Sequence, residues 1–89
     1  MAPSAHRRYK RLQSRLKEKV QEEAHTLARD PLRYPELKGP LKGIRSYHFQ
    51  YENAQYRIAY RVNDERQQIE ILLVKSRESF YHTLKRIVR

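Results

Sequence analysis

A small set of side chains in the second half of the chain could act together on a phosphodiester: His48, Gln50, Arg57, Arg77 and Tyr81. Paired arginines neutralise and orient phosphate oxygens, and a histidine can accept or donate a proton near neutral pH. A tyrosine can donate a hydrogen bond or stack on a base. If the attacking group is the 2′-hydroxyl of an RNA, the protein supplies positioning, charge stabilisation and proton transfer, and needs no metal.

Three adjoining strands are predicted to position these residues, at 44–51, 56–63 and 68–75. Apolar and polar residues alternate in the first two strands, so one face of the sheet should be apolar and the other polar. The polar face would carry His48, Gln50, Arg57 and Arg61. Residues 69–74 are apolar at both parities, which is typical of a central strand covered on both faces.

The predicted sheet is flanked by helices. Apolar residues recur every three or four positions from Tyr9 to Leu27, and either two helices, 4–13 and 14–29, or one long helix fits this pattern. Asp30 and Pro31 end it, because proline disfavours helical geometry in the preceding residue. A connection follows, from which Leu32, Tyr34, Leu37 and Leu41 are expected to fold back onto the core. Turns are predicted at 52–55 and 63–66, and a short helix at 79–89.

Length and composition indicate one small domain, residues 1–89. The 89 residues contain no cysteine, so no disulfide can form. The sequence has no apolar run long enough to span a bilayer and no hydrophobic signal segment at its N-terminus. We therefore expect a cytoplasmic protein without a membrane partner.

The net charge indicates a polyanionic partner. Twenty Lys and Arg residues against ten Asp and Glu residues give a formal charge of +10. Such an excess attracts polyanions through counterion release. A generally solvated basic surface and an acidic protein partner are the alternatives. Nucleic acid is favoured, because Arg and aromatic residues alternate through the predicted sheet as phosphate contacts and stacking platforms require.

Composition and spacing alone favour an RNA-binding or protein-binding module over an enzyme. A single histidine on a strand is more often an ordinary polar residue than a catalyst, and exposed arginines are usually solvated. The sequence lacks a cysteine nucleophile, a glycine-rich nucleotide loop and paired His or carboxylate spacing for zinc. We therefore expect neither a metal nor a cofactor.

Five segments, taken in order along nearly the whole chain, resemble the RelE/ParE superfamily of bacterial type II toxins. They are PSAHRRYKRL, LARDP, LKGPLKGIRSYHF, YRIAYRV and VKSRESFY. The resemblance implies an α+β fold, in which an N-terminal helical hairpin packs on one face of a small twisted antiparallel sheet. This sheet would have three to four strands, and a short C-terminal helix would follow it.

The resemblance also implies an activity. The RelE branch cuts mRNA in the ribosomal A site through the 2′-hydroxyl of the mRNA, and an antitoxin silences the toxin. By position, the catalytic residues would be His48, Arg57, Arg77 and Tyr81, and the substrate-binding residues Gln50, Arg45, Arg61 and Lys75. Ribosomal RNA would contact Arg7, Arg8, Lys10, Arg11, Arg15, Lys17 and Lys19. The expected partners are a cognate antitoxin, the ribosome and mRNA, with operator DNA bound only through the antitoxin complex.

This sequence departs from the family pattern at several positions. His48 and Gln50 occupy positions where the best-known members have lysines, and Ser76 stands where a histidine is frequent. The helical pattern begins at Pro3, where relatives have a strand, so the sheet should be one strand smaller unless the chain is truncated or starts late. Two rival functions stay open: a ParE-like toxin that inhibits DNA gyrase, and an inactive toxin that binds only antitoxin and operator DNA.

Overall fold

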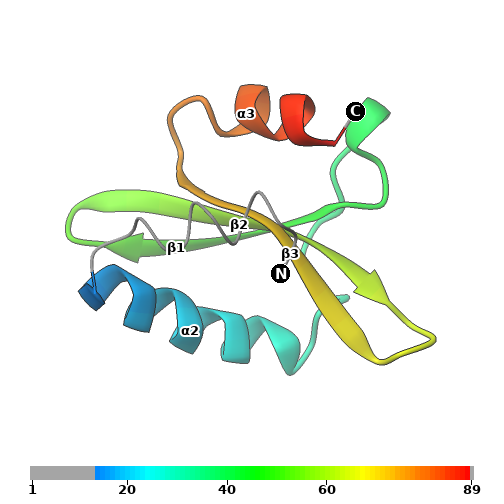
Figure 1. The fold of residues 1–89 in the computed structure, drawn as a ribbon, viewed down its shortest axis with the longest axis horizontal. Helices are drawn as coiled ribbons and strands as arrows, with labels where there is room; N and C mark the ends of the chain where they lie inside the picture. Colours follow the sequence, from blue (N-terminus) through cyan, green and yellow to red (C-terminus); the bar gives the residue numbers. More distant parts are fainter. Residues whose placement is uncertain (1–13, 89) are drawn as a thin grey trace.

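The described part of the chain is a three-stranded antiparallel sheet with one helix against each face (Figure 1). The computed structural model describes residues 14–88. Its elements are α2 (Ser14–Ala28), a 3₁₀ turn η1 (Gly39–Leu41), β1 (Arg45–Tyr51), β2 (Ala54–Asn63), β3 (Gln68–Ser76) and α3 (Phe80–Ile87). The strands lie in the order β1-β2-β3. The predicted α+β class, the three strands and the short C-terminal helix are confirmed.

Helix α2 covers the first face of the sheet. It buries Leu16, Val20 and Leu27, which the sequence pattern places on one side of the helix. The predicted helix at 14–29 is confirmed and ends just before Asp30 and Pro31. The helix predicted at 4–13 lies outside the described residues. Within residues 14–88, no helix has both the length and the apolar composition needed to cross a membrane.

Hydrogen bonds from two tyrosines tie α2 and the following segment to the sheet. The Tyr47 hydroxyl donates to Glu23 Oε1 at 2.7 Å, and the Tyr60 hydroxyl donates to the Pro31 carbonyl at 2.5 Å. Burial raises the pKa of Tyr60 to about 12, and burial together with Glu23 raises the pKa of Tyr47. Both tyrosines belong to the apolar cluster between α2 and the sheet, so each buried hydroxyl has a partner.

Helix α3 covers part of the second face, which the sequence predicted to be polar in the first two strands. Phe80 and Leu84 enter a second apolar cluster there with Ala59, Leu72 and Leu73. The pairing register explains this cluster, because Ala59 pairs with Leu73 while the next residue, Tyr60, pairs with Ile71. Leu72 is therefore an extra residue, and the bulge lets two adjacent leucines reach the cluster under α3. The predicted cover of residues 69–74 on both faces is thus present, but the prediction of a polar second face was wrong where α3 packs.

Strand β3 lies at an edge of the described sheet rather than at its centre, so that prediction was also wrong. The apolar residues at both parities are explained by the two helices. Ile71 and Val74 face the α2 cluster, whereas Leu72 and Leu73 face the α3 cluster. Because a helix packs on each face of β3, this edge strand is apolar on both faces, as a central strand would be.

The connections differ from the prediction in three places. Only Glu52 and Asn53 separate β1 from β2, and their positive φ angles of 47° and 65° fit a two-residue hairpin turn. Residues 64–67 separate β2 from β3, one position later than predicted. In the segment after α2, Leu41 is buried and both Tyr34 and Leu37 are partly buried, whereas Leu32 is 56% exposed. The prediction that Leu32 packs on the core was wrong.

The packing of α3 can be tested with two matched substitutions. Leu84→Ala removes a fully buried side chain and should lower the free energy of unfolding by about 2–5 kcal/mol. Leu32→Ala makes the same chemical change at an exposed position and should shift that free energy by less than about 0.5 kcal/mol. Urea denaturation measures both values. Equal losses in the two variants would contradict the assignment of Leu84 to the core.

Candidate functional site

Three polar side chains form a row across the sheet, one from each strand. In the strand register His48 pairs with Arg57, and Arg57 pairs with Lys75. Because these residues are direct cross-strand partners, their side chains share one face. It is the face that α3 partly covers, since Ala59, two residues after Arg57, packs under α3.

The pairing type brings His48 and Arg57 close together. The Arg77 backbone N–H donates to the Gln55 carbonyl at 2.8 Å, so the backbone polar groups of Gln55 point toward β3. Arg57, two residues further on, has the same orientation. His48 and Arg57 are therefore a non-hydrogen-bonded pair, in which the Cα atoms lie about 4.5 Å apart and the side chains approach most closely.

Arg57 makes two contacts with Tyr81. Its Nη1 donates a hydrogen bond to the Tyr81 hydroxyl, and its Cζ lies 5.2 Å from the centroid of the Tyr81 ring. A guanidinium within about 6 Å of a ring centroid gains cation–π attraction. Tyr81 therefore restrains the guanidinium of Arg57 on the exposed sheet face.

Helix α3 fixes the position of Tyr81. The preceding residue, Phe80, is 1% exposed and lies edge-on to the Tyr81 ring, with 5.4 Å between the ring centroids. Tyr81 itself is 41% exposed. Burial of Phe80 thus anchors the first turn of α3 and leaves its neighbour at the surface, beside Arg57.

One polar atom of Arg57 makes no hydrogen bond within residues 14–88. This atom is Nε, which is buried, so an acceptor from outside reaches it only if the side chain moves. The Nη donors that Tyr81 does not occupy remain for an external acceptor. A phosphate oxygen suits them, because arginine binds phosphates through several N–H groups at once.

The pKa of His48 is lowered, first by partial burial and second by the positive charge of Arg57. Both causes disfavour the imidazolium ion. His48 is therefore neutral at a pH near 7, with one ring nitrogen able to accept a proton.

A second row lies one step along the same face, about 7 Å from the first. Gln50 pairs with Gln55, and the backbone of Arg77 continues this row through its hydrogen bond to Gln55. The side chains of all three are exposed. Sequence reasoning missed Gln55, because it assigned this residue to a turn that is in fact two residues shorter.

Lys75 lies at the end of the first row, where the chain leaves β3. Its Nζ donates to the Glu78 carbonyl at 2.8 Å. This bond holds the ammonium group near the start of α3 while leaving two of its three N–H donors for other acceptors.

Two other predicted substrate-binding residues lie away from the row. Arg61 is four residues beyond Arg57 on β2, and it pairs with Glu70, with 3.9 Å between Nη1 and Oε1. Arg45 donates to the carbonyls of Leu32 and Tyr34, at 3.2 and 2.6 Å. Its odd position puts it on the α2 face, with Tyr47. The structure thus brings His48, Arg57, Lys75 and Tyr81 together, but not Arg45 or Arg61.

The predicted ribosomal RNA contacts are divided between described and undescribed residues. Arg7, Arg8, Lys10 and Arg11 lie outside the described residues. Arg15, Lys17 and Lys19 lie on α2, against the opposite face of the sheet from α3 (Figure 1). Lys19 also forms an ion pair with Glu23, at 3.4 Å.

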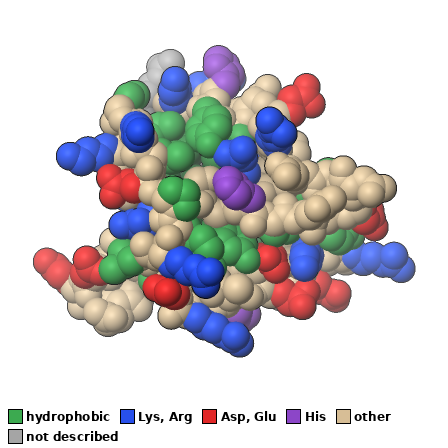
Figure 2. All heavy atoms as spheres, turned by 180° about the vertical axis from the view of Figure 1, so that it is seen from behind, with side chains coloured by type: hydrophobic (Ala, Val, Ile, Leu, Met, Phe, Trp, Pro, Cys, Tyr) green, Lys and Arg blue, Asp and Glu red, His purple; other side chains and the backbone are tan. Residues whose placement is uncertain are grey.

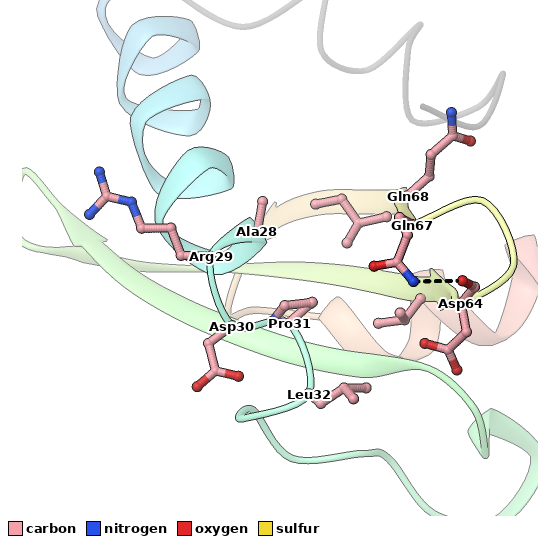
Figure 3. Close-up of a pocket in the computed structure, with 10 residues that line it drawn as sticks. Ala28, Arg29, Asp30, Pro31, Leu32, Asp64, Gln67 and Gln68 are labelled. Carbon is pink, nitrogen blue, oxygen red and sulfur yellow. Dashed lines mark hydrogen bonds between the residues drawn. The ribbon is translucent and has the colours of Figure 1, made fainter.

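A pocket of about 300 Å³ lies at another part of the molecule (Figure 3). Residues 28–32, at the end of α2 and after it, form one wall, and residues from the turn between β2 and β3 and the adjoining strand ends form the other. Gln67 Nε2 donates to the Asp64 carbonyl there, at 2.9 Å. The pocket contains none of the predicted catalytic residues. The described part of the chain also has no group of three His, Asp or Glu residues that could hold a metal ion.

The comparisons with known proteins agree with this architecture. The family model for the ParE-like toxin of type II bacterial toxin–antitoxin systems matches residues 1–85. The chain belongs to this toxin family. The resemblance to the RelE/ParE superfamily is thereby confirmed.

A solved structure supports the fold of this toxin. The chain is similar to a chain in the crystal structure of the toxin–antitoxin complex RelBE2 from Mycobacterium tuberculosis. The two are 33% identical with a TM-score of 0.74, and the match covers 85% of this toxin and 91% of that chain. No curated protein matched the sequence.

The electrostatic coupling between His48 and Arg57 of the toxin can be measured by NMR. Arg57→Gln removes the charge that disfavours the imidazolium ion, so the pKa of His48 should rise toward the ordinary value for histidine. Titrating the His48 ring signals in both proteins gives the shift. Arg61→Gln, the same change four residues along β2, should move the pKa far less, and equal shifts would contradict the direct pairing.

Proposed function

We propose that this toxin is an endoribonuclease that cuts mRNA in the ribosomal A site, using the 2′-hydroxyl of the mRNA as nucleophile. The observation that carries the proposal is the pairing of His48 with Arg57 on an exposed sheet face. A neutral imidazole and a restrained guanidinium lie side by side there, with the Tyr81 hydroxyl beside them. These are the groups that phosphodiester transfer within an RNA strand requires.

His48 is the general base of this mechanism. Its neutral ring takes the proton from the 2′-hydroxyl as the 2′-oxygen forms a bond to the adjacent phosphorus. The lowered pKa keeps the ring unprotonated near pH 7, so the base is present in its active form. The bond from phosphorus to the 5′-oxygen breaks, which leaves a 2′,3′-cyclic phosphate and a 5′-hydroxyl.

The arginines stabilise the negative charge that develops on the phosphoryl oxygens. Arg57 offers the guanidinium Nη donors that Tyr81 does not occupy. Lys75 adds a charge in the same row, and Arg77 adds another from the second row. Donors held in place before the reaction stabilise the transition state without the cost of reorganising them.

Tyr81 is the proton donor to the leaving 5′-oxygen. Its oxygen accepts a hydrogen bond from Arg57, so its own hydrogen is free to point to another acceptor. Its exposed ring can also stack on a base beside the cleaved bond. Gln50, in the second row, contributes hydrogen bonds but no charge, unlike the lysine found at its position in the best-known relatives.

The cellular partners follow from this activity and from the family. The RelBE2 structure is a toxin–antitoxin complex, which supports a cognate antitoxin for this toxin as well. An antitoxin with acidic and apolar segments would neutralise the charge around Arg57, and operator DNA would be bound only through that complex. The ribosome and its mRNA are the targets, and their location makes the toxin cytoplasmic.

Inhibition of DNA gyrase is the second candidate function. The matching family is described as ParE-like, and toxins of the ParE branch are not nucleases. That function does not require a neutral histidine beside a restrained arginine. A toxin that only binds its antitoxin and operator DNA is the third candidate, and Gln50 favours it because an amide cannot replace a lysine charge.

Two arginines on the same strand separate these functions. Arg57→Ala should slow cleavage of ribosome-bound mRNA by about 100-fold or more, because it removes oxyanion stabilisation. Arg61→Ala should slow it by less than about threefold, because Arg61 pairs with Glu70 away from the row. Single-turnover cleavage of a defined mRNA on purified ribosomes gives both rates.

The alternatives predict different results from these variants. Equal effects of Arg57→Ala and Arg61→Ala on cleavage would show that general positive charge, not the His48–Arg57 pair, drives the reaction. If both variants and the unaltered toxin arrest growth equally and inhibit DNA supercoiling by gyrase, the nuclease proposal is wrong.

A further inference from the structure

The outer face of α3 carries a second group of residues suited to nucleic acid. Tyr81, His82, Lys85 and Arg86 are all exposed, whereas Phe80 and Leu84 point into the core. We define these four exposed residues as the α3 outer face. The residues predicted to contact ribosomal RNA lie in the N-terminal region and do not include Lys85 and Arg86.

This face is continuous with the cleavage site. Lys85 lies one helical turn after Tyr81, about 6 Å along the axis, and on the same side of the helix. Side chains of a helix tilt toward its N-terminus, so Lys85 leans toward Tyr81. Because Tyr81 contacts Arg57, positive charge extends from Arg57 past the tyrosine ring to Lys85.

The charge of α3 differs from that of α2. Helix α3 contains Lys85 and Arg86 and no acidic residue. Helix α2 contains three Lys and Arg residues and three Glu residues, so these charges balance: Arg15, Lys17, Lys19, Glu18, Glu22 and Glu23. In Figure 2 the upper part, where α3 lies, shows Lys, Arg and His side chains around an apolar patch, with acidic side chains at its edges.

We propose that the α3 outer face binds the RNA strand that extends from the cleavage site, with Lys85 and Arg86 contacting consecutive phosphates. Tyr81 lies at the junction, where one base can stack on its exposed ring. Alternation of an aromatic ring with cationic groups is typical of surfaces that bind single-stranded RNA. An acidic protein is the less suitable occupant, because within the α3 outer face only Tyr81 offers an apolar anchor for it.

This inference rests on the proposed nuclease function, but its test does not require cleavage. The probe is a fluorescent single-stranded RNA of twelve 2′-O-methyl nucleotides, which cannot be cut because the 2′-oxygen is blocked. Its affinity for the full chain is measured by anisotropy between 50 and 300 mM KCl. Each phosphate contact with a single strand contributes about 0.7 to the slope of log K against log salt concentration.

The double variant Lys85→Gln/Arg86→Gln should bind the probe at least about tenfold more weakly at 100 mM KCl. The magnitude of its slope of log K against log salt concentration should be smaller by about 1.4. The control Arg29→Gln/Arg33→Gln removes two exposed charges from the segment that follows α2. Its slope should change by less than half as much. Lys85→Arg/Arg86→Lys keeps both charges and should bind as the unaltered toxin does. Circular dichroism and melting temperature show that each variant is folded.

Equal slopes for the two neutral double variants would overturn the proposal, because binding would then depend on net charge alone. Normal RNA binding by Lys85→Gln/Arg86→Gln together with lost antitoxin binding would also overturn it, and would assign the α3 outer face to a protein partner. If the RNA-binding effect is found but ribosome-bound mRNA stays intact, the nuclease function fails while the RNA-binding face stands.

Discussion

The packing of Phe80 against the second face of the sheet is the constraint on which the candidate site depends. It completes the apolar cluster that contains Leu73 and Leu84, and it fixes the first turn of α3. The next residue, Tyr81, is thereby held at the surface beside Arg57. Burial of one aromatic ring thus determines the position of its exposed neighbour, and the helix acts as the support of the site.

Arg57 connects the remaining parts of the site. After burial, its charge is the second cause that lowers the pKa of His48, and its Nη1 donates to the Tyr81 hydroxyl. In the proposed mechanism the same cation helps to keep the base neutral and also contacts the phosphate. An anion bound there would weaken the repulsion that disfavours the imidazolium ion, so substrate binding itself should help His48 hold the proton that it accepts.

The central part of the candidate site was predictable from the sequence because successive side chains of a strand point to opposite faces of the sheet. Once 44–51 and 56–63 are strands whose apolar rows lie on one face, His48 and Arg57 share the other face. Periodicity cannot show that α3 covers part of that face, because the bulge at Leu72 shifts the register by one residue. Likewise, Arg45 was predicted to bind substrate, but it donates to two carbonyls of a distant loop, and such tertiary partners leave no local pattern.

The measurement that tests the account most directly is the chemistry of the RNA ends made by the unaltered toxin. The purified protein is added to ribosomes that carry a defined mRNA with a known codon in the A site, and new RNA ends are mapped. The account predicts a break within that codon, with a 2′,3′-cyclic phosphate on one fragment and a 5′-hydroxyl on the other. Intact mRNA from a folded sample, or ends with a 3′-hydroxyl and a 5′-phosphate, would contradict it.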